Sequence, residues 1–384
     1  ANAQGNPVPA AAATTISLGT NGGLGMLGGN TCGAVPAGAS QVTIEDVVYD
    51  HARDGVQIGA VASGLSIPTQ AVDLDLDFDF DAEVIAFRRD LGSQEDIYLM
   101  TVDGSAFVNL TDHEDGDTDP AWSPDGSRLA FVSTRSGTAD LWVMNADGTG
   151  LVQVTDDQGS VRFPNWSPDG TRIAYSASVN DQRDLYVIDA PAPASGPAAA
   201  SPIFAQAEPP AQLTDDPGVD NEPVWSPAGS EIFFFSNRDG VGAVWTIDIL
   251  GDGGANPVKL TIDFVFACAP GRGFSLVDSR QKLSFVGETD GQLDIWTMDL
   301  DGSNQTKVTS DEADEFYSSW MNGGPATTAT GPDRQAAQGS RLVFDSDRSG
   351  FWQLYSINED GSDVVRLTDY EADDEMPRWR AARD

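Results

Sequence analysis

The stretch "DPAWSPDGSRLAFVSTRSGTADLWVMNADGTGLVQVT", residues 119–155, decides the fold. Four apolar or β-branched runs, "AWS", "RLAFVS", "DLWVM" and "LVQVT", are separated in it by "PDGS", "TRSGTA" and "NADGTG". Short runs of this kind bounded by Gly, Pro, Asn and Asp are typical of strands. The Asp-Gly pairs suit tight hairpin turns that need positive φ. The stretch therefore predicts a meander of four short strands.

The same pattern recurs along most of the chain. Each unit closes on a threonine, at Thr111, Thr155, Thr214, Thr261, Thr309 and Thr368, with periods of 44, 59, 47, 48 and 59 residues. Eleven residues after five of these threonines stands a tryptophan, at Trp122, Trp166, Trp225, Trp320 and Trp379, which we interpret as blade core. Position 272 breaks the rule, and we assign this place in the fifth unit to Phe274. A four-stranded meander repeated about every 45 residues predicts propeller blades.

Two copies of the unit carry a family resemblance. "PAWSPDGSRLAFVSTR" (120–135) and "PNWSPDGTRIAYSAS" (164–178) resemble the TolB-like β-propeller repeat, which is related in shape to WD-type repeats. The resemblance covers roughly residues 83–384 and weakens from the fourth unit onward. It implies a propeller that binds partner proteins or scaffolds an attached domain. The expected fold is all-β: a β-propeller of four-stranded blades over 71–384, with six blades favoured and seven as the alternative, after an extended N-terminal arm over 1–70.

How the ring closes is open at this point. "DLDLDFDFD" (73–81) aligns with the first strand of a blade, and "MPRWRA" (376–381) does too, so the chain has one first strand too many. In one arrangement, "MPRWRA" closes blade one and the aspartate strand lies outside or on a neighbouring subunit. In a second, "MPRWRA" and N-terminal strands around 45–62 form a seventh blade. In a third, the C-terminus is loosely attached.

The aspartate strand and the Gly-rich tail before it are predicted to form an assembly interface. In a strand the side-chain period is two, so the five aspartates share one face and the large apolar residues share the other. Ordering a Gly-rich tail costs roughly 1 to 2 kcal/mol per residue, which extensive contacts must offset. The predicted interface residues are Leu74, Leu76, Phe78 and Phe80.

Composition restricts the partners and the compartment. Asp+Glu 60 against Lys+Arg 21 leaves a net charge of -39, which excludes a nucleic-acid partner because phosphate binding needs a basic footprint. No run approaches the ~20 apolar residues that span a bilayer. The start "ANAQGNPVPA" is typical of a mature exported protein, so we expect a secreted, extracellular or periplasmic protein of bacterial type. An exported chain with two cysteines predicts a disulfide between Cys32 and Cys268, with an intermolecular bridge or free thiols as alternatives.

The connections between units are acidic, as in 112–119, 215–222, 310–315 and 369–375, and by repeat they should form an acidic ring on one face. Asp115, Asp117 and Asp119 alternate around Gly116 like a hard-cation loop, so calcium is a possible cofactor there; solvated or arginine-paired carboxylates are the alternative. The repeat arginines Arg135, Arg238 and Arg348 should open on the same face and pair with neighbouring aspartates.

Catalysis finds little support in the sequence. His51 and His113 are its only histidines, and it contains no Gly-x-Ser-x-Gly elbow, phosphate loop or dinucleotide fingerprint. We therefore predict an exported, non-enzymatic propeller that acts as a structural or interaction subunit and assembles with copies of itself through its N-terminal arm. The alternative is a monomeric envelope propeller of the TolB type that binds another protein. A carbohydrate-active enzyme with a chance carboxylate pair is third.

Overall fold

The computed structural model describes residues 79–380 except 93, 105, 157–158, 193–208, 250–256, 262–274, 278–280, 290, 322–340 and 370. For strands β1–β7 and β23 it describes the backbone. No helix occurs in these described parts.

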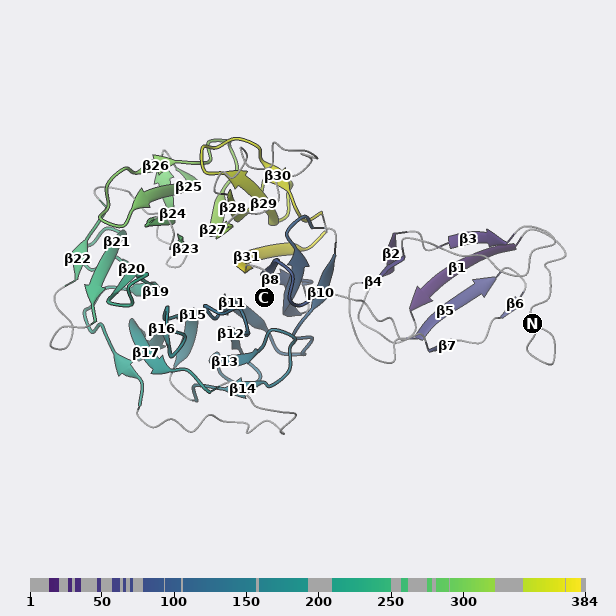
Figure 1. Cartoon of the computed structure of the whole chain (residues 1–384), viewed down its shortest axis with the longest axis horizontal. Coiled ribbons are helices and arrows are strands. Elements are labelled where there is room, and N and C mark those ends of the chain that lie inside the picture. Colours follow the sequence, from purple (N-terminus) through teal and green to yellow (C-terminus); the bar gives the residue numbers. More distant parts are fainter. Residues whose placement is uncertain are drawn as a thin grey trace. The chain divides into compact units, whose positions relative to one another are not determined.

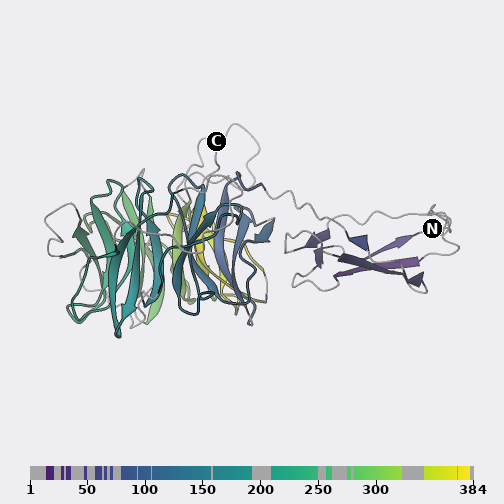
Figure 2. The same cartoon turned by 90° about the horizontal axis from the view of Figure 1, so that it is seen from below.

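Six four-stranded antiparallel sheets form a ring, and each sheet is one blade of a propeller (Figure 1). Seen from the side, the blade strands run roughly along the axis of the ring (Figure 2). In each blade one strand lies next to the axis and its three partners follow outward. The predicted all-β class and the six-bladed form are confirmed.

From the axis outward, blade one has β31 (Asp373–Arg380), β8 (Val84–Asp90), β9 (Glu95–Thr101) and β10 (Phe107–Asn109); blade two has β11 (Asp117–Trp122), β12 (Arg128–Ser133), β13 (Asp140–Asn145) and β14 (Val152–Gln153). In the same order, blade three has β15 (Ser160–Trp166), β16 (Arg172–Val179), β17 (Gln182–Asp189) and β18 (Ala211–Gln212); blade four has β19 (Asp220–Trp225), β20 (Glu231–Ser236), β21 (Ala243–Asp248) and β22 (Val258–Lys259). Blade five has β23 (Ser275–Val277), β24 (Lys282–Thr289), β25 (Gln292–Asp299) and β26 (Thr306–Lys307); blade six has β27 (Glu315–Met321), β28 (Arg341–Ser346), β29 (Gln353–Asn358) and β30 (Val365–Arg366).

The C-terminal strand closes the ring. β31 pairs with β8 and so supplies the first strand of blade one. Arg380, at its end, donates hydrogen bonds from Nη2 to the carbonyl oxygens of Phe80 (2.6 Å) and Ala82 (2.7 Å) and from Nη1 to that of Gly126 (3.2 Å). Gly126 has φ +65, and a Cβ there would lie 2.7 Å from the Arg380 side chain, so this contact favours glycine. Closure by "MPRWRA" is confirmed, and the seventh blade is wrong.

Residues 79–82 form a turn rather than the end of the strand predicted over 73–81. The Asp79 carbonyl accepts from the Ala82 amide (3.1 Å), and Asp79 Oδ1 accepts from the Asp81 amide (2.9 Å). An aspartate that bonds the amide two residues on favours a turn. The strand prediction is therefore wrong at Phe80, which is half-buried in this turn. The other predicted interface residues, Leu74, Leu76 and Phe78, lie outside the described residues.

The N-terminal region is a compact unit of its own, made of residues 1–78 with 107–109, and the rest of the chain is the second unit. Its strands are β1 (Thr14–Thr20), β2 (Leu27–Gly29), β3 (Cys32–Val35), β4 (Val47–Tyr49), β5 (Gln57–Ala62), β6 (Leu65–Ser66) and β7 (Gln70–Ala71). One sheet has the order β3-β1-β5-β6 with β7 also on β5, and β2 pairs with β4. The described parts of the segment 45–62, β4 and β5, therefore belong to these ladders and not to a blade.

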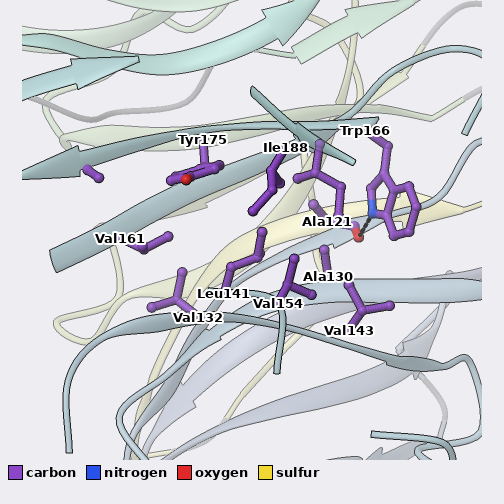
Figure 3. Packing of buried hydrophobic residues seen from close by; sticks show 12 residues of the cluster. Ala121, Ala130, Val132, Leu141, Val143, Val154, Val161, Trp166, Tyr175 and Ile188 are labelled. Atoms are coloured by element: carbon purple, nitrogen blue, oxygen red, sulfur yellow. Dashed lines mark hydrogen bonds between the residues drawn. The ribbon is translucent and has the colours of Figure 1, made fainter. Parts of the chain in front are cut away.

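Neighbouring blades are joined by apolar side chains that pack face to face. Between blades two and three, small and branched residues of one sheet meet Trp166, Ile173 and Tyr175 of the next (Figure 3). Trp166 Nε1 donates to the Ala121 carbonyl (3.1 Å), and the Arg128 guanidinium lies 4.5 Å from the Trp166 ring centroid. The alternation of apolar residues in each strand therefore builds the core between the blades.

The threonine that closes each unit has the same role in all six blades. Its hydroxyl accepts the backbone N–H of a third-strand residue, which the short fourth strand leaves without a ladder partner. These pairs are Thr111 with Ile97, Thr155 with Leu141, Thr214 with Leu185, Thr261 with Val244, Thr309 with Ile295 and Thr368 with Leu354, at 2.9 to 3.0 Å.

The first-strand tryptophan is buried as predicted in three blades, at Trp166, Trp225 and Trp320. In blade five, Leu276 pairs with Leu283 in the register in which Trp166 pairs with Ile173. The prediction that Phe274 takes this place is therefore wrong, because the strand register assigns it to Leu276. Phe274 itself lies outside the described residues.

Candidate binding face

Two sets of loops lie at one end of the ring: the connections from one blade to the next, and the hairpins between second and third strands. They share an end because antiparallel neighbours reverse direction. We call this end the connection face and the opposite end the turn face. The predicted acidic segments 112–119, 215–222, 310–315 and 369–375 all join a last strand to a first strand, so they lie on the connection face.

Arginines bind the buried carboxylates of this face. In blade two, Arg135 Nη2 donates to both oxygens of Asp117 (2.9 and 2.8 Å), and its Nε donates to Ser133 Oγ (2.7 Å). The guanidinium also lies 5.5 Å from the Phe131 ring and 5.3 Å from the Trp142 ring. Charge, fork geometry and ring contacts together fix this arginine.

The same arrangement is present in three other blades. Arg238 pairs with Asp216 and Asp220, and Arg348 pairs with Asp311 and Glu315. The predicted pairing of Arg135, Arg238 and Arg348 is confirmed. Blade one uses Arg89, which donates to Asp374 (2.7 and 3.0 Å) and contacts the Phe87 and Tyr98 rings. Arg89 could not be predicted from the repeat, because it follows its strand aromatic by two residues, whereas Arg135 follows by four.

The structure does not bring the predicted calcium ligands together. Asp117 is buried against Arg135, and Asp119 accepts from Arg162 Nε (2.5 Å). Asp115 is half-buried, with 45% of its side chain exposed and Oδ2 3.4 Å from His113 Nδ1. In the part of the chain that the structure describes, no group of three or more His, Cys, Asp or Glu side chains is arranged to hold a metal ion. Calcium binding stays a prediction.

Among the described residues, four of the six exposed large apolar side chains lie on the connection face, and the other two, Val258 and Val364, lie at the turn-face end. The tips of the hairpins between second and third strands carry Leu91 in blade one, Val179 in blade three, Val241 in blade four and Phe351 in blade six. Their exposed fractions are 44, 38, 44 and 44%. Large apolar residues repeated at loop tips of one face, beside acidic loops, indicate an interaction surface.

A shallow pocket lies on this face in blade six, lined by Asp311, Glu312, Ala313, Asp347 and Arg348. Arg348 Nη2 reaches from it to Asp311 Oδ2 (3.0 Å) and to the buried Glu315 Oε1 (2.9 Å). Burial raises the pKa of Glu315 to about 8, because desolvation outweighs the attraction of Arg348. The pocket is therefore lined by exposed carboxylates and by Arg348, which joins it to the buried Glu315 beside it.

In five of the six first strands the ladder has a bulge, and the bulged residue has a positive φ between 41 and 58. These residues are Asp119, Phe163, Glu222, Tyr317 and Met376. Bulges re-aim side chains and recur near functional sites.

Two of these residues meet across the axis. Blades three and six are opposite in a ring of six, yet the rings of Phe163 and Tyr317 stack with centroids 6.4 Å apart. Burial, followed by the charges of Glu222 and Asp119, raises the pKa of Tyr317 well above its ordinary value. This contact joins blades three and six across the centre of the ring.

On the turn face the aspartates bond within their own loops. Asp125 accepts from Ser123 Oγ (2.6 Å) and Ser127 Oγ (2.8 Å), and Asp169 accepts from Ser167 Oγ (2.6 Å) and Thr171 Oγ1 (2.8 Å). These hydrogen bonds lower the pKa of Asp169 to about 2.

The remaining residues singled out in the sequence are the cysteines and histidines. Cys268 and His51 lie outside the described residues, and of Cys32 only the backbone in β3 is described. His113 Nδ1 accepts from the Asp115 amide (3.1 Å) in an acidic connection.

The comparisons with known proteins agree with this architecture. The TolB beta propeller domain matches residues 75–159. An uncharacterized protein of Agrobacterium fabrum is 32% identical over 97 residues, which are 25% of this chain and only 28% of that relative's length. TolB from Acinetobacter baumannii has a similar structure, with a TM-score of 0.59 at 18% identity over 86% of this chain and 80% of that one. A putative TolB from Agrobacterium tumefaciens gives 0.52 at 18% over 77% and 91%.

These findings confirm that the repeat is TolB-like and that the fold is the TolB propeller fold. Among the described residues, no helix has the length and apolar character to cross a membrane.

Proposed function

We propose that this chain is a protein-binding propeller that docks a basic partner protein on its connection face. One observation carries the proposal: four exposed apolar hairpin tips stand on the face that also holds the acidic connections. The TolB-like repeat supports it, because that resemblance implies binding of partner proteins. The sequence alone favoured self-assembly and gave this function as the alternative.

Electrostatics defines the kind of partner. Arginines hold the buried carboxylates of the face, whereas Glu312 and Asp347 remain exposed and Asp115 is half-buried. With a net charge of -39, the chain attracts basic proteins and raises their association rate. The apolar tips then supply the area that leaves water on docking.

The test compares three immobilised proteins with an extract of the source organism. They are the wild type, the double variant Val241→Ser with Phe351→Ser, and the control Val364→Ser, whose exposed valine lies on the turn face before β30. We expect the wild type and the control to retain the same discrete basic protein, and the double variant to lose it at least about tenfold, since two apolar anchors are removed. Equal retention by all three proteins would rule out the connection face as the docking site.

Self-association through the N-terminal region is a second proposal. What supports it is that residues 1–78 form a compact unit with its own sheet, in which β3 and β6 are edge strands. A chain starting at residue 79 should remain folded and lose association in light scattering. A full-length chain that is already monomeric would contradict this proposal and leave docking untouched.

We also propose that the chain is exported, that Cys32 and Cys268 form a disulfide, and that the protein is not an enzyme. Thiol labelling of unreduced, denatured protein tests the disulfide, since two reactive thiols per chain would contradict it. The non-enzymatic role is supported by the TolB-like propellers to which the chain is similar.

A further inference from the structure

At the connection-face end of each blade, three side-chain positions lie close together, and we call them the triad. The first position is on the first strand, the second is the residue paired with it on the second strand, and the third is at the start of the third strand. In blade one these are Glu375, Arg88 and Glu95. Arg88 Nη1 donates to Glu95 Oε1 (2.5 Å), and its Nη2 contacts Glu375 Oε2. A cation between two acids therefore fills this place in blade one.

Blade six shows that the outer members of this triad touch each other. Its equivalents are Phe316, opposite Asp345, and Trp352 at the start of the third strand. The Phe316 and Trp352 rings have centroids 4.8 Å apart. Side chains at these two positions thus converge whatever their chemistry.

In blade three the same positions hold Arg162, Ser176 and Arg183. Arg183 Nη1 donates to Ser176 Oγ (3.2 Å), and Ser176 Oγ in turn donates to Asn221 Oδ1 (2.6 Å). Ser176 therefore positions the Arg183 guanidinium beside Arg162. The charges are the reverse of those in blade one: two cations, with a hydroxyl between them.

The two arginines differ in their ion pairs with carboxylates. Arg162 is paired with Asp119 through Nε (2.5 Å). Arg183 is half-buried, and among the described residues it forms no ion pair within 4.0 Å. Burial, and then the charge of Arg162, lower the pKa of Arg183, and the charge of Asp119, which is already bound to Arg162, opposes this shift only in part. A partly desolvated guanidinium beside a second one gains free energy when a carboxylate accepts its hydrogen bonds.

We propose that Arg162 and Arg183 form a carboxylate-binding site on the connection face of blade three. The site binds one carboxylate between two guanidinium groups. In blade one the charges are reversed, because one guanidinium lies between the carboxylates of Glu375 and Glu95. The net charge of -39 repels free anions, but it is screened beyond ~8 Å at physiological salt, so the local guanidinium pair decides binding. Resting on the proposed function, we assign the carboxylate to an acidic side chain of the docked basic partner, which fixes the partner's orientation.

The site itself is tested with acetate, independently of any partner. Thermal melts in sodium acetate and in sodium chloride are compared at equal ionic strength for wild type, Arg183→Gln, Arg183→Lys and the control Arg366→Gln. We expect saturable stabilisation of the wild type by acetate, about 2 °C at ten times the dissociation constant. Arg366→Gln should respond like the wild type, Arg183→Lys less, and Arg183→Gln not at all. An identical response of Arg183→Gln and wild type would overturn the site.

A second arm separates a partner's carboxylate from a free small anion. Two lysine-rich peptides, identical except for one central glutamate or glutamine, are titrated into wild type and Arg183→Gln. Selective loss of the glutamate peptide's extra affinity in Arg183→Gln supports the partner assignment. If acetate saturates and the two peptides bind alike, the site serves small anions and the partner assignment is wrong. If neither peptide binds, the proposed docking of basic partners fails while the acetate result still decides the site.

Discussion

The two faces of the ring use aspartate in opposite ways. On the turn face, Asp125 and Asp169 accept hydrogen bonds from hydroxyls of their own loops and stay in water. On the connection face, Asp117 and Asp220 are fully buried and paired with arginines from hairpins about 18 residues further along the chain. The turn-face carboxylates therefore stabilise single turns, whereas the connection-face carboxylates tie separate loops into one rigid surface.

This difference predicts unequal costs of mutation, and the largest is for an arginine of the connection face. Arg135→Met leaves the buried Asp117 carboxylate without its partner, so the free energy of unfolding in urea should fall by about 3 to 5 kcal/mol. The double variant Asp117→Asn with Arg135→Met removes the unpaired charge and should recover most of that loss. A double variant as unstable as the single one would mean that packing of Arg135 between its rings, and not its charge, holds the loop.

The two faces should also respond to pH with opposite signs. The pKa of Glu315 is raised from 4.5 to about 8 in the folded protein, so its contribution is complete below about pH 4.5 and is lost as pH rises through 8. Between pH 5 and 9 the unfolding free energy of the wild type should fall by about 2 to 4 kcal/mol because of this group. The Glu315→Gln variant should not show this fall. A wild-type stability that is flat over this range would contradict the raised pKa.

The fold was predictable because it is repeated six times, whereas the binding face depends on residues that differ from blade to blade and that only the strand register brings together. The unit-closing threonines and the pairing of Arg135 follow from one copy of the pattern. Arg162 and Arg183 are 21 residues apart in an ordinary-looking segment, and only the strand register places them together. If the strand register had been known, comparing equivalent positions of blades one and three would have revealed this pair in the sequence.

The bulges, and the turn that includes Phe80, were missed for a related reason. Each depends on a left-handed residue or a local side-chain bond that overrides the alternation of apolar and polar residues. At Asp79 the side chain bonds the Asp81 amide and ends the extended pattern.

Replacing an aspartate of the turn face should lower the free energy of unfolding less than replacing Arg135. Asp169→Ala removes the hydrogen bonds from Ser167 and Thr171, and because the site is exposed we expect a loss of about 1 kcal/mol in urea unfolding. The pKa of Asp169 is lowered to about 2, so its contribution is present above pH 3.8 and disappears as pH falls toward 2. The difference between wild type and variant should therefore shrink in acid, and a difference that grows there would reverse the assignment.

The smallest expected effect concerns calcium. Since Arg135 holds Asp117 and Arg162 holds Asp119, a calcium ion on this loop must rely on the partly exposed Asp115 and on water. Stabilisation by calcium relative to chelator, at fixed ionic strength, should then stay below about 1 kcal/mol, the range of exposed charge pairs. Asp115→Asn should abolish it, whereas Asp169→Asn on the turn face should leave it unchanged. Stabilisation several times larger, surviving Asp115→Asn, would show that calcium displaces the arginines from Asp117 and Asp119, and the rigid character assigned to the connection face would be wrong.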